Sequence, residues 1–328
     1  MNRLIFVEGI PGCGKSTTSQ FVAQQLERNG FNVVWIHEGL EDHPLWEERD
    51  DYFNDDGYVN EEHFDIYTES LITKLDKIKK DIFDNNKVYV IDGAIFAGFA
   101  NVYYKSDCQP EQTMKYFKKV ESSLSELKPL LIYLDTARVR EHTIETWEGR
   151  AMWGKKIVIE SYGKIPHVKR GGYQGNDILF AYINPLNEQN REYFDSCGFD
   201  KLCFNIDNRE YGKYHSEIAN FLGIELVDNP IDNHILEDFI GWYDNDRDKR
   251  NMLVKVLDGN LVCDWGQMNM ALIYVKPYTY NLRSYPIYIE FIKRGNEIVG
   301  AKTYGEQCFR RAGCQFARVE ETKHEIRK

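Results

Sequence analysis

The chain has 328 residues, with 41 Lys and Arg residues against 52 Asp and Glu residues, which gives a formal net charge of −11. This acidic balance argues against a nucleic-acid-binding protein, because such proteins normally carry a basic surface that neutralises phosphates. With 42% apolar and 28% charged residues, the composition is that of a globular protein long enough for two domains.

The first apolar run, residues 4–7, predicts a buried strand, and a phosphate-binding motif follows it. The segment Gly9-Ile-Pro-Gly-Cys-Gly-Lys-Ser16 matches GxxxxGK[ST] without a mismatch, and a helical pattern ending near Gly30 comes next. In such a P-loop the backbone amides bind nucleotide phosphates, the lysine adds charge at the β and γ phosphates, and the hydroxyl binds Mg²⁺. We therefore predict ATP and Mg²⁺ as cofactors, with Lys15 as a catalytic residue and Ser16 as a metal ligand. The predicted nucleotide-binding residues are Gly9, Ile10, Pro11, Gly12, Cys13, Gly14, Lys15, Ser16 and Thr17.

The stretch Phe6-Val-Glu-Gly-Ile-Pro-Gly-Cys-Gly-Lys-Ser-Thr17 resembles the opening of the thymidylate kinase and deoxynucleoside kinase superfamily, whose P-loop begins with an acidic residue and a glycine. The resemblance covers residues 1 to about 226 in strand order. It implies a phosphotransferase core with strand order 2-3-1-4-5. It also implies an acceptor pocket between the second and third strands and a mobile basic lid after the fourth.

The second apolar run, residues 33–36, is followed by His37 and Glu38. Deoxynucleoside kinases carry at this point the carboxylate that accepts the proton of the acceptor hydroxyl, so the resemblance implies Glu38 as the general base. The alternative is one more carboxylate on an exposed loop. His37 is expected to be a half-buried structural residue, with a hydrogen bond to the acceptor as the alternative. Residues 38–62 hold eleven acidic residues and one base, Arg49, and form either a solvated loop or a wall that favours a cationic acceptor.

The third apolar run, residues 88–91, ends at Asp92 in a Walker-B-like pattern. We predict Asp92 to be a catalytic residue that holds Mg²⁺ through water. At this point the sequence departs from the family, because thymidylate kinases have Asp-Arg and deoxynucleoside kinases Glu-Arg where this chain has Asp92-Gly93. A guanidinium group is the usual clamp for an acceptor phosphate. The missing Arg therefore predicts an acceptor without a phosphate.

The fourth and fifth apolar runs, residues 130–134 and 202–206, complete the predicted parallel sheet, with helical patterns between the runs. The resemblance implies that lid arginines neutralise the transition state, and we predict Arg150 as the catalytic one. At least half of the lid bases are expected to be plain surface charges. The basic residues of this region are Arg138, Arg140, Arg150, Lys155, Lys156, Lys169 and Arg170.

Beyond residue 226 the pattern changes from alternating strands and helices to consecutive strands. Residues 227–233 have the composition of a linker, and a short helix is expected over residues 235–248. The steps Asp258-Gly259 and Gly295-Asn296 are hairpin signals, which predict a small antiparallel sheet or barrel. We expect its aromatic residues to form a core rather than a stacking platform.

The predicted fold class is therefore α/β, a P-loop NTPase three-layer parallel sheet of order 2-3-1-4-5 with a smaller C-terminal antiparallel β-rich domain. The domain boundaries are 1–228 for the kinase-like domain and 229–328 for the β-rich domain. Seven cysteines without a CxxC pair indicate reduced thiols, and no apolar run approaches the roughly 18 residues of a membrane span. We expect a cytoplasmic protein with no membrane or nucleic-acid partner, and a homodimer is compatible with the sequence.

The predicted function is an ATP- and Mg²⁺-dependent phosphotransferase that acts on a hydroxyl of a small non-phosphorylated acceptor, either a nucleoside or an amine-bearing natural product. The alternative is a nucleotide-dependent binding or regulatory P-loop protein with little phosphoryl transfer. A nucleoside monophosphate kinase of the thymidylate type is disfavoured by the Gly that follows Asp92.

Overall fold

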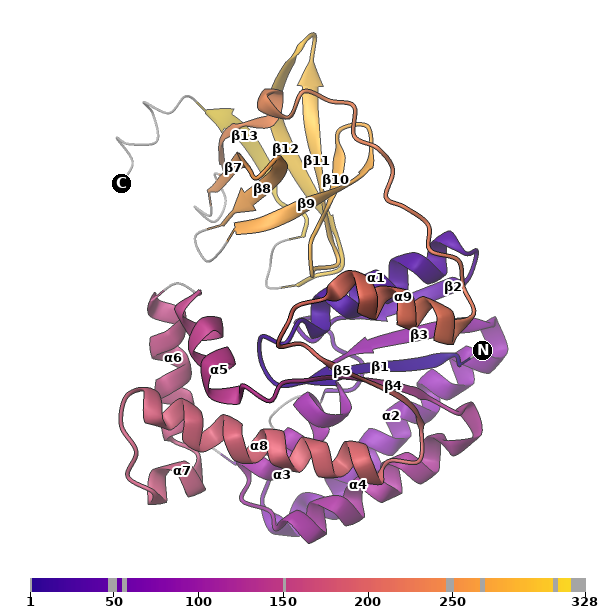
Figure 1. Cartoon of the computed structure of the whole chain (residues 1–328), viewed down its shortest axis with the longest axis vertical. Coiled ribbons are helices and arrows are strands. Elements are labelled where there is room, and N and C mark those ends of the chain that lie inside the picture. The colour runs from indigo at the N-terminus through magenta and orange to yellow at the C-terminus, as the bar shows by residue number, and fades with distance from the viewer. Residues whose placement is uncertain are drawn as a thin grey trace. The chain divides into compact units, whose positions relative to one another are not determined.

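The computed structural model of the chain describes residues 2–46, 52–54, 58–149, 152–245, 251–265, 269–308 and 312–319. The chain forms two compact units (Figure 1). Unit 1 comprises Met1–Glu38, His43–Glu148 and Met152–Leu226, and unit 2 comprises Gly39–Asp42, Gly149–Ala151 and Val227–Lys328.

Unit 1 is built on a parallel sheet, which among the described residues has five strands in the order β2-β3-β1-β4-β5. This order confirms the prediction. The strands are β1 (Leu4–Gly9), β2 (Asn32–Ile36), β3 (Lys87–Asp92), β4 (Leu130–Asp135) and β5 (Asp200–Asn205). Strand β1 is central and pairs with β3 on one side, where Phe6 lies opposite Ile91, and with β4 on the other. The P-loop that follows β1 therefore starts at the middle of the sheet.

Helices cover both faces of this sheet (Figure 1). Helices α1 and α9 lie on one face, and α2, α4 and α8 on the other. The α-helices of unit 1 are α1 (Lys15–Arg28), α2 (Phe64–Asn85), α3 (Asn101–Lys105), α4 (Pro110–Leu124), α5 (Val139–Glu148), α6 (Met152–Gly163), α7 (Pro166–Arg170), α8 (Asn176–Ser196) and α9 (Tyr211–Leu222). Short helical turns are η1 (Glu61–His63) and η3 (Ser125–Leu127), both 3-10, and η2 (Ile95–Ala100), which is a π-helix.

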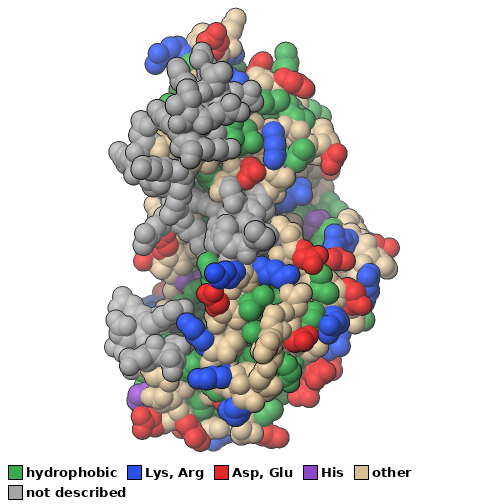
Figure 2. All heavy atoms as spheres, turned by 90° about the vertical axis from the view of Figure 1, so that its left-hand side faces the viewer, with side chains coloured by type: hydrophobic (Ala, Val, Ile, Leu, Met, Phe, Trp, Pro, Cys, Tyr) green, Lys and Arg blue, Asp and Glu red, His purple; other side chains and the backbone are tan. Residues whose placement is uncertain are grey.

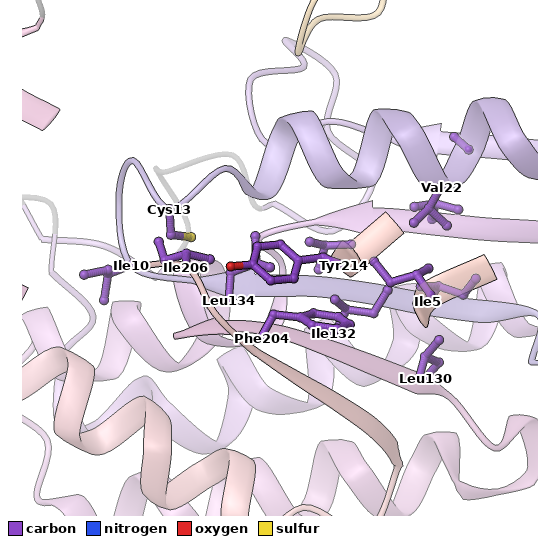
Figure 3. Packing of buried hydrophobic residues seen from close by; sticks show 14 of the residues in the cluster. Ile5, Ile10, Cys13, Val22, Leu130, Ile132, Leu134, Phe204, Ile206 and Tyr214 are labelled. Atoms are coloured by element: carbon purple, nitrogen blue, oxygen red, sulfur yellow. The ribbon is translucent and has the colours of Figure 1, made fainter. Parts of the chain in front are cut away.

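The core of unit 1 explains why the strands read as nearly continuous apolar runs. On the α1 and α9 face, Ile5, Ile132 and Leu134 are buried and pack with Val22 of α1 and Tyr214 of α9 (Figure 3). On the other face, alternate strand residues such as Phe6 and Tyr133 are equally buried. Each fully buried side chain of this size stabilises the fold by roughly 1.5–3 kcal/mol. Burial on both faces fixes the strand register at the edge that carries the functional residues.

Unit 2 contains a closed antiparallel barrel, with eight strands among the described residues in the order β10-β11-β12-β13-β6-β7-β8-β9. Its strands are β6 (Gly241–Asp244), β7 (Met252–Leu257), β8 (Asn260–Asp264), β9 (Asn269–Lys276), β10 (Thr279–Leu282), β11 (Ile287–Arg294), β12 (Glu297–Gly305) and β13 (Gln315–Val319). Inward-facing residues such as Tyr243, Tyr280 and Phe291 form a core separate from that of unit 1. In the same unit Leu40 pairs with Cys308, and the Glu41 N–H donates to the Gln307 carbonyl at 3.1 Å.

The helix expected over residues 235–248 is wrong in its described part. Leu236–Phe239 is one 3-10 turn, η4, and Gly241–Asp244 is the barrel strand β6. The pairing of β6 with β13 on one side and with β7 on the other, which buries Tyr243, outweighed the local helical pattern. None of the described helices is long and apolar enough to cross a membrane.

Candidate functional site

The P-loop joins β1 to α1, as the motif predicts. Gly12 has a φ of +84°, and a Cβ at this position would stand 2.2 Å from Thr146 Oγ1 of α5. Only glycine combines this backbone conformation with such a close neighbour. The loop thus has the curled form that turns backbone amides toward an anion, and it begins a helix whose positive end reinforces the attraction.

Cys13 lies on the inner side of the P-loop. Its side chain is fully buried and points into the core near Ile206 and Tyr214 (Figure 3). Burial raises the pKa of the Cys13 thiol to about 11, although the nearby Lys15 charge opposes the shift. The neutral side chain of Cys13 therefore anchors the loop in the core.

Lys15 is the buried cation of the site. Its side chain is 6% exposed, and Nζ donates to the Ile10 carbonyl at 3.4 Å and lies 3.8 Å from Glu38 Oε2. Burial lowers the pKa of Lys15, but nearby carboxylates, with Glu38 first and then Asp92 and Glu8, outweigh burial and raise the pKa above its usual value. Lys15 is therefore charged at any physiological pH.

Glu38 stands at the end of β2 with 41% of its side chain exposed. It lies next to Lys15 rather than on a distant loop, so the structure brings together two residues that are 23 positions apart in the sequence. Because the P-loop lysine marks where the terminal phosphates bind, a carboxylate this close is within reach of a group that approaches the γ phosphate.

Asp92 ends β3 and is fully buried, and within the described residues neither of its carboxyl oxygens has a hydrogen-bond partner. His37 Nε2 is 3.8 Å from Asp92 Oδ2. Burial raises the pKa of Asp92 well above its usual value, and the charge of Glu38 adds to this, while Lys15 and the nearby Ser16 hydroxyl oppose it. An orphaned buried carboxyl beside a P-loop serine fits a divalent cation, which would supply the missing partner.

Gly93 follows Asp92, at the position where the kinases that the sequence resembles have Arg. Its φ is +66°, and its N–H donates to the Val7 carbonyl at 2.9 Å. A Cβ here would stand 3.1 Å from Glu38 Oε2, 3.1 Å from Lys15 Cε and 3.3 Å from Ala97 Cβ. We call Glu38, Gly93 and Ala97 together the acceptor side of the site.

Part of the region that carries this site matches the model of a known protein family. Residues 5–105, which carry the P-loop, Glu38 and Asp92, match the family model described as AAA domain. The first unit is a P-loop NTPase-like domain. A search of curated proteins gave no match. Among solved structures, the chain is similar to the YorR protein from Bacillus subtilis in complex with phosphorylated GDP, with 13% identity, 67% of this chain and 95% of that chain covered, and a TM-score of 0.35.

The predicted lid bases of the P-loop domain have several different surroundings. Arg138 is exposed at the start of α5, and the Arg140 guanidinium lies 3.9 Å from the centre of the Phe180 ring. Arg170 pairs with Asp107 at 2.7 Å. Arg150, the arginine predicted to neutralise the transition state, lies outside the described residues. On the face of Figure 2, basic and acidic side chains are interspersed over the helices of unit 1, which matches surface charges better than one basic patch.

The loop after β5 is held in place by polar contacts. Asp207 accepts hydrogen bonds from the Thr136 hydroxyl and from the Ala137 N–H, and Arg209 bonds to Glu145 of α5. The Tyr211 ring, at the start of α9, lies near Gly14 of the P-loop. The loop after β5 is thus bonded to the residues around the start of α5 and to α5 itself, and the residue that begins α9 lies beside the P-loop.

Two groups near the site were given no role from the sequence. Glu8, the last residue before the P-loop glycine, is fully buried and accepts hydrogen bonds from the N–H groups of Ile95 and Ala97. His43 stacks on Trp46 with ring centres 4.3 Å apart, and the Nε2 atom of His43 is buried without a partner in the described part of the chain. The acid-glycine pair was a clue to Glu8, but its partners depend on the path of the chain after Asp92.

Proposed function

We propose that the protein is an ATP- and Mg²⁺-dependent phosphotransferase that transfers the γ-phosphoryl group to a hydroxyl of a small, non-phosphorylated acceptor. The observation that carries this proposal is the exposed Glu38 carboxylate 3.8 Å from Lys15 Nζ of the P-loop. A carboxylate at this place can accept the proton of a hydroxyl that approaches the γ phosphate.

The proposed reaction uses the residues of this chain in separate roles. The P-loop amides and Lys15 bind the triphosphate. Glu38 accepts the proton of the acceptor hydroxyl while the oxygen of that hydroxyl bonds to the γ phosphorus. The bond between the γ phosphorus and the bridging β-γ oxygen breaks, and ADP leaves. Lys15 stabilises negative charge at the transferred group throughout.

Ser16 and Asp92 would hold the magnesium ion. When bound, Mg²⁺ neutralises charge on the phosphate oxygens. The fully buried Asp92 carboxyl, without a hydrogen-bond partner among the described residues, supports this assignment, because an uncompensated carboxyl is costly in the interior.

The surroundings of Gly93 support an acceptor that carries no phosphate. A side chain at this position would need a left-handed backbone and would press against Glu38 and Lys15. An arginine would therefore be strained at the point where the kinases that the sequence resembles use one. Glu38 at the acceptor side would in addition repel an anionic acceptor.

The test is phosphoryl transfer from radiolabelled Mg·ATP to a panel of unphosphorylated hydroxyl compounds, including nucleosides and aminoglycosides, with dTMP for comparison. We expect one class of the panel to be labelled and dTMP to remain unlabelled. Glu38→Gln should lower transfer about 10²–10⁴-fold, as the loss of a general base does, and leave ATP affinity unchanged.

Glu61→Gln is the matched control, because Glu61 is an exposed carboxylate of the same acidic segment on the η1 turn. It should leave transfer unaltered. Tight ATP binding without transfer to any panel member would instead support a nucleotide-dependent binding protein, and labelling of dTMP would overturn the choice of acceptor.

A further inference from the structure

Glu8 has the geometry of an internal anchor between the P-loop strand and the turn after β3. It is fully buried at the end of β1, one residue before the P-loop begins. The Ile95 N–H donates to Glu8 Oε1 at 2.6 Å, and the Ala97 N–H donates to Oε2 at 3.1 Å. Both amides belong to the first turn of η2, whose N–H groups have no partner within the helix itself.

The turn that Glu8 anchors borders the acceptor side. A Cβ added to Gly93 would stand 3.3 Å from the Cβ of Ala97 and 3.1 Å from Oε2 of Glu38, so these two groups lie close together around Gly93. One residue further, a Cβ on Gly98 would stand 3.4 Å from Nε1 of Trp46, a residue whose side chain is 43% exposed. A displacement of η2 would therefore change the space beside the general base.

A π-helix is seldom stable by its own hydrogen bonds, and such turns are found mostly where a site requires them. The apolar η2 sequence Ile-Phe-Ala-Gly-Phe-Ala offers no side-chain cap, and none is formed at Ala94. A buried carboxylate that bonds to both free amides is a directional constraint that an apolar side chain in its place would not provide.

We propose that Glu8 is a positioning residue for the acceptor, which fixes η2 so that Ala97 and Gly93 stand at the distance from Glu38 that the acceptor hydroxyl requires. This inference rests on the proposed phosphotransferase function. Glu8 acts through the backbone amides of η2. It also helps to raise the pKa of Lys15, but Glu38 is the largest charge acting on that lysine, which stays charged without Glu8. Its loss should thus affect the acceptor and spare the nucleotide.

The first test compares Glu8→Gln with the unaltered protein by hydrogen exchange and by binding of a fluorescent ATP analogue with Mg²⁺. Glutamine keeps the size of the side chain but turns an NH₂ group toward one of the two amides. We expect the amide that faces the glutamine NH₂ group, that of Ile95 or that of Ala97, to exchange about tenfold faster, as for the loss of one buried hydrogen bond. The affinity for the ATP analogue should stay within about twofold of the unaltered value.

The second test measures KM and kcat with the panel compound that the unaltered protein phosphorylates fastest. In Glu8→Gln the KM for that acceptor should rise about tenfold to a hundredfold, since small misplacements at a reacting centre cost this much, and the KM for ATP should not change. Asp135→Asn is the matched control, because Asp135 ends the neighbouring strand β4 and bonds to Arg191 at 2.9 Å rather than to η2. Asp135→Asn should not raise the KM for the acceptor relative to the KM for ATP.

Unchanged exchange at Ile95 and Ala97, or equal losses for ATP and acceptor, would overturn the positioning role. If Glu8→Gln does not fold, Gly98→Ala tests the same turn from the Trp46 side and should also raise the acceptor KM alone. If no panel compound is phosphorylated, the proposed function fails. The exchange result then decides whether Glu8 fixes η2. Faster exchange with unchanged ATP affinity would show that Glu8 holds the η2 turn in place, and the role toward an acceptor would be overturned.

Discussion

Gly93 accounts for the departure from the family pattern in atomic terms. Its positive φ and its three close neighbours, Glu38, Lys15 and Ala97, make a side chain there strained. The sequence alone indicates only that an arginine is missing. The structure adds that the side chains of Glu38 and Lys15 lie against the position that a Cβ would take.

Gly93→Ala should destabilise the protein by about 1–2 kcal/mol, because a left-handed backbone costs an L-residue this much, and should reduce phosphoryl transfer by displacing Glu38. Urea denaturation with paired transfer assays measures both effects. Gly154 of α6 is the contrasting site, since it has no positive φ and no atom within 4 Å of an added Cβ. Gly154→Ala should stabilise by up to about 1 kcal/mol, and equal effects at both sites would contradict the argument.

The residues of the candidate site differ in how far they could be predicted. The P-loop follows from its motif, and the place of Glu38 and Asp92 follows from strand ends that meet at one edge of a parallel sheet. Their roles remain predictions. Glu8 and His43 could not be found this way, because their significance depends on backbone amides and on a ring stack that no spacing encodes.

Helix α5 packs against the P-loop. His142 Nε2 lies 3.2 Å from the Pro11 carbonyl, and Thr146 occupies the space beside Gly12. Burial lowers the pKa of His142, with the bond to Pro11 opposing the shift, so the neutral ring donates through Nε2 at neutral pH. Helix α5, whose residues the sequence places only in a basic lid region, thus also contacts and supports the P-loop.

His142→Ala should weaken the binding of Mg·ATP about fivefold, the equivalent of one hydrogen bond of about 1 kcal/mol. Fluorescence titration with an ATP analogue measures the change. Glu141→Ala, an exposed neighbour on the same helix, is expected to bind like the unaltered protein. Equal affinity in both variants would show that α5 does not support the loop.

Elements with a strong period were predictable, and elements set by tertiary packing were not. The parallel strands read as apolar runs because both faces are buried. The η2 turn is apolar at nearly every position, so no pattern distinguishes a π-helix from other buried segments. The expected helix at 235–248 failed because barrel closure required β6 there.

At the scale of the whole molecule, two separate cores predict two unfolding events. One core lies beneath the P-loop sheet and the other inside the barrel. In calorimetry, Mg·ATP at 100 times its dissociation constant should stabilise the unit that binds it by about 2.7 kcal/mol, so one transition should move and the other stay. Mg²⁺ without nucleotide serves as the reference. A single transition that shifts as a whole would mean that the units unfold together.

The barrel itself was foreseeable as a set of hairpins, because the Asp-Gly and Gly-Asn steps mark tight turns between alternating strands. Its closure was not, since the pairing of β13 with β6 joins strands about 75 residues apart that no local pattern relates.

The pairing of Leu40 with Cys308 has a practical consequence for dissecting the protein. Leu40 belongs to the barrel unit, although it immediately follows the strand end that carries Glu38. The chain is therefore not a pair of modules in tandem, and no single cut yields both pieces intact. A fragment that stops at Leu226 would leave residues 39–42 without their backbone partners. A barrel expressed from Val227 onward would lack the segment that Cys308 and Gln307 bind.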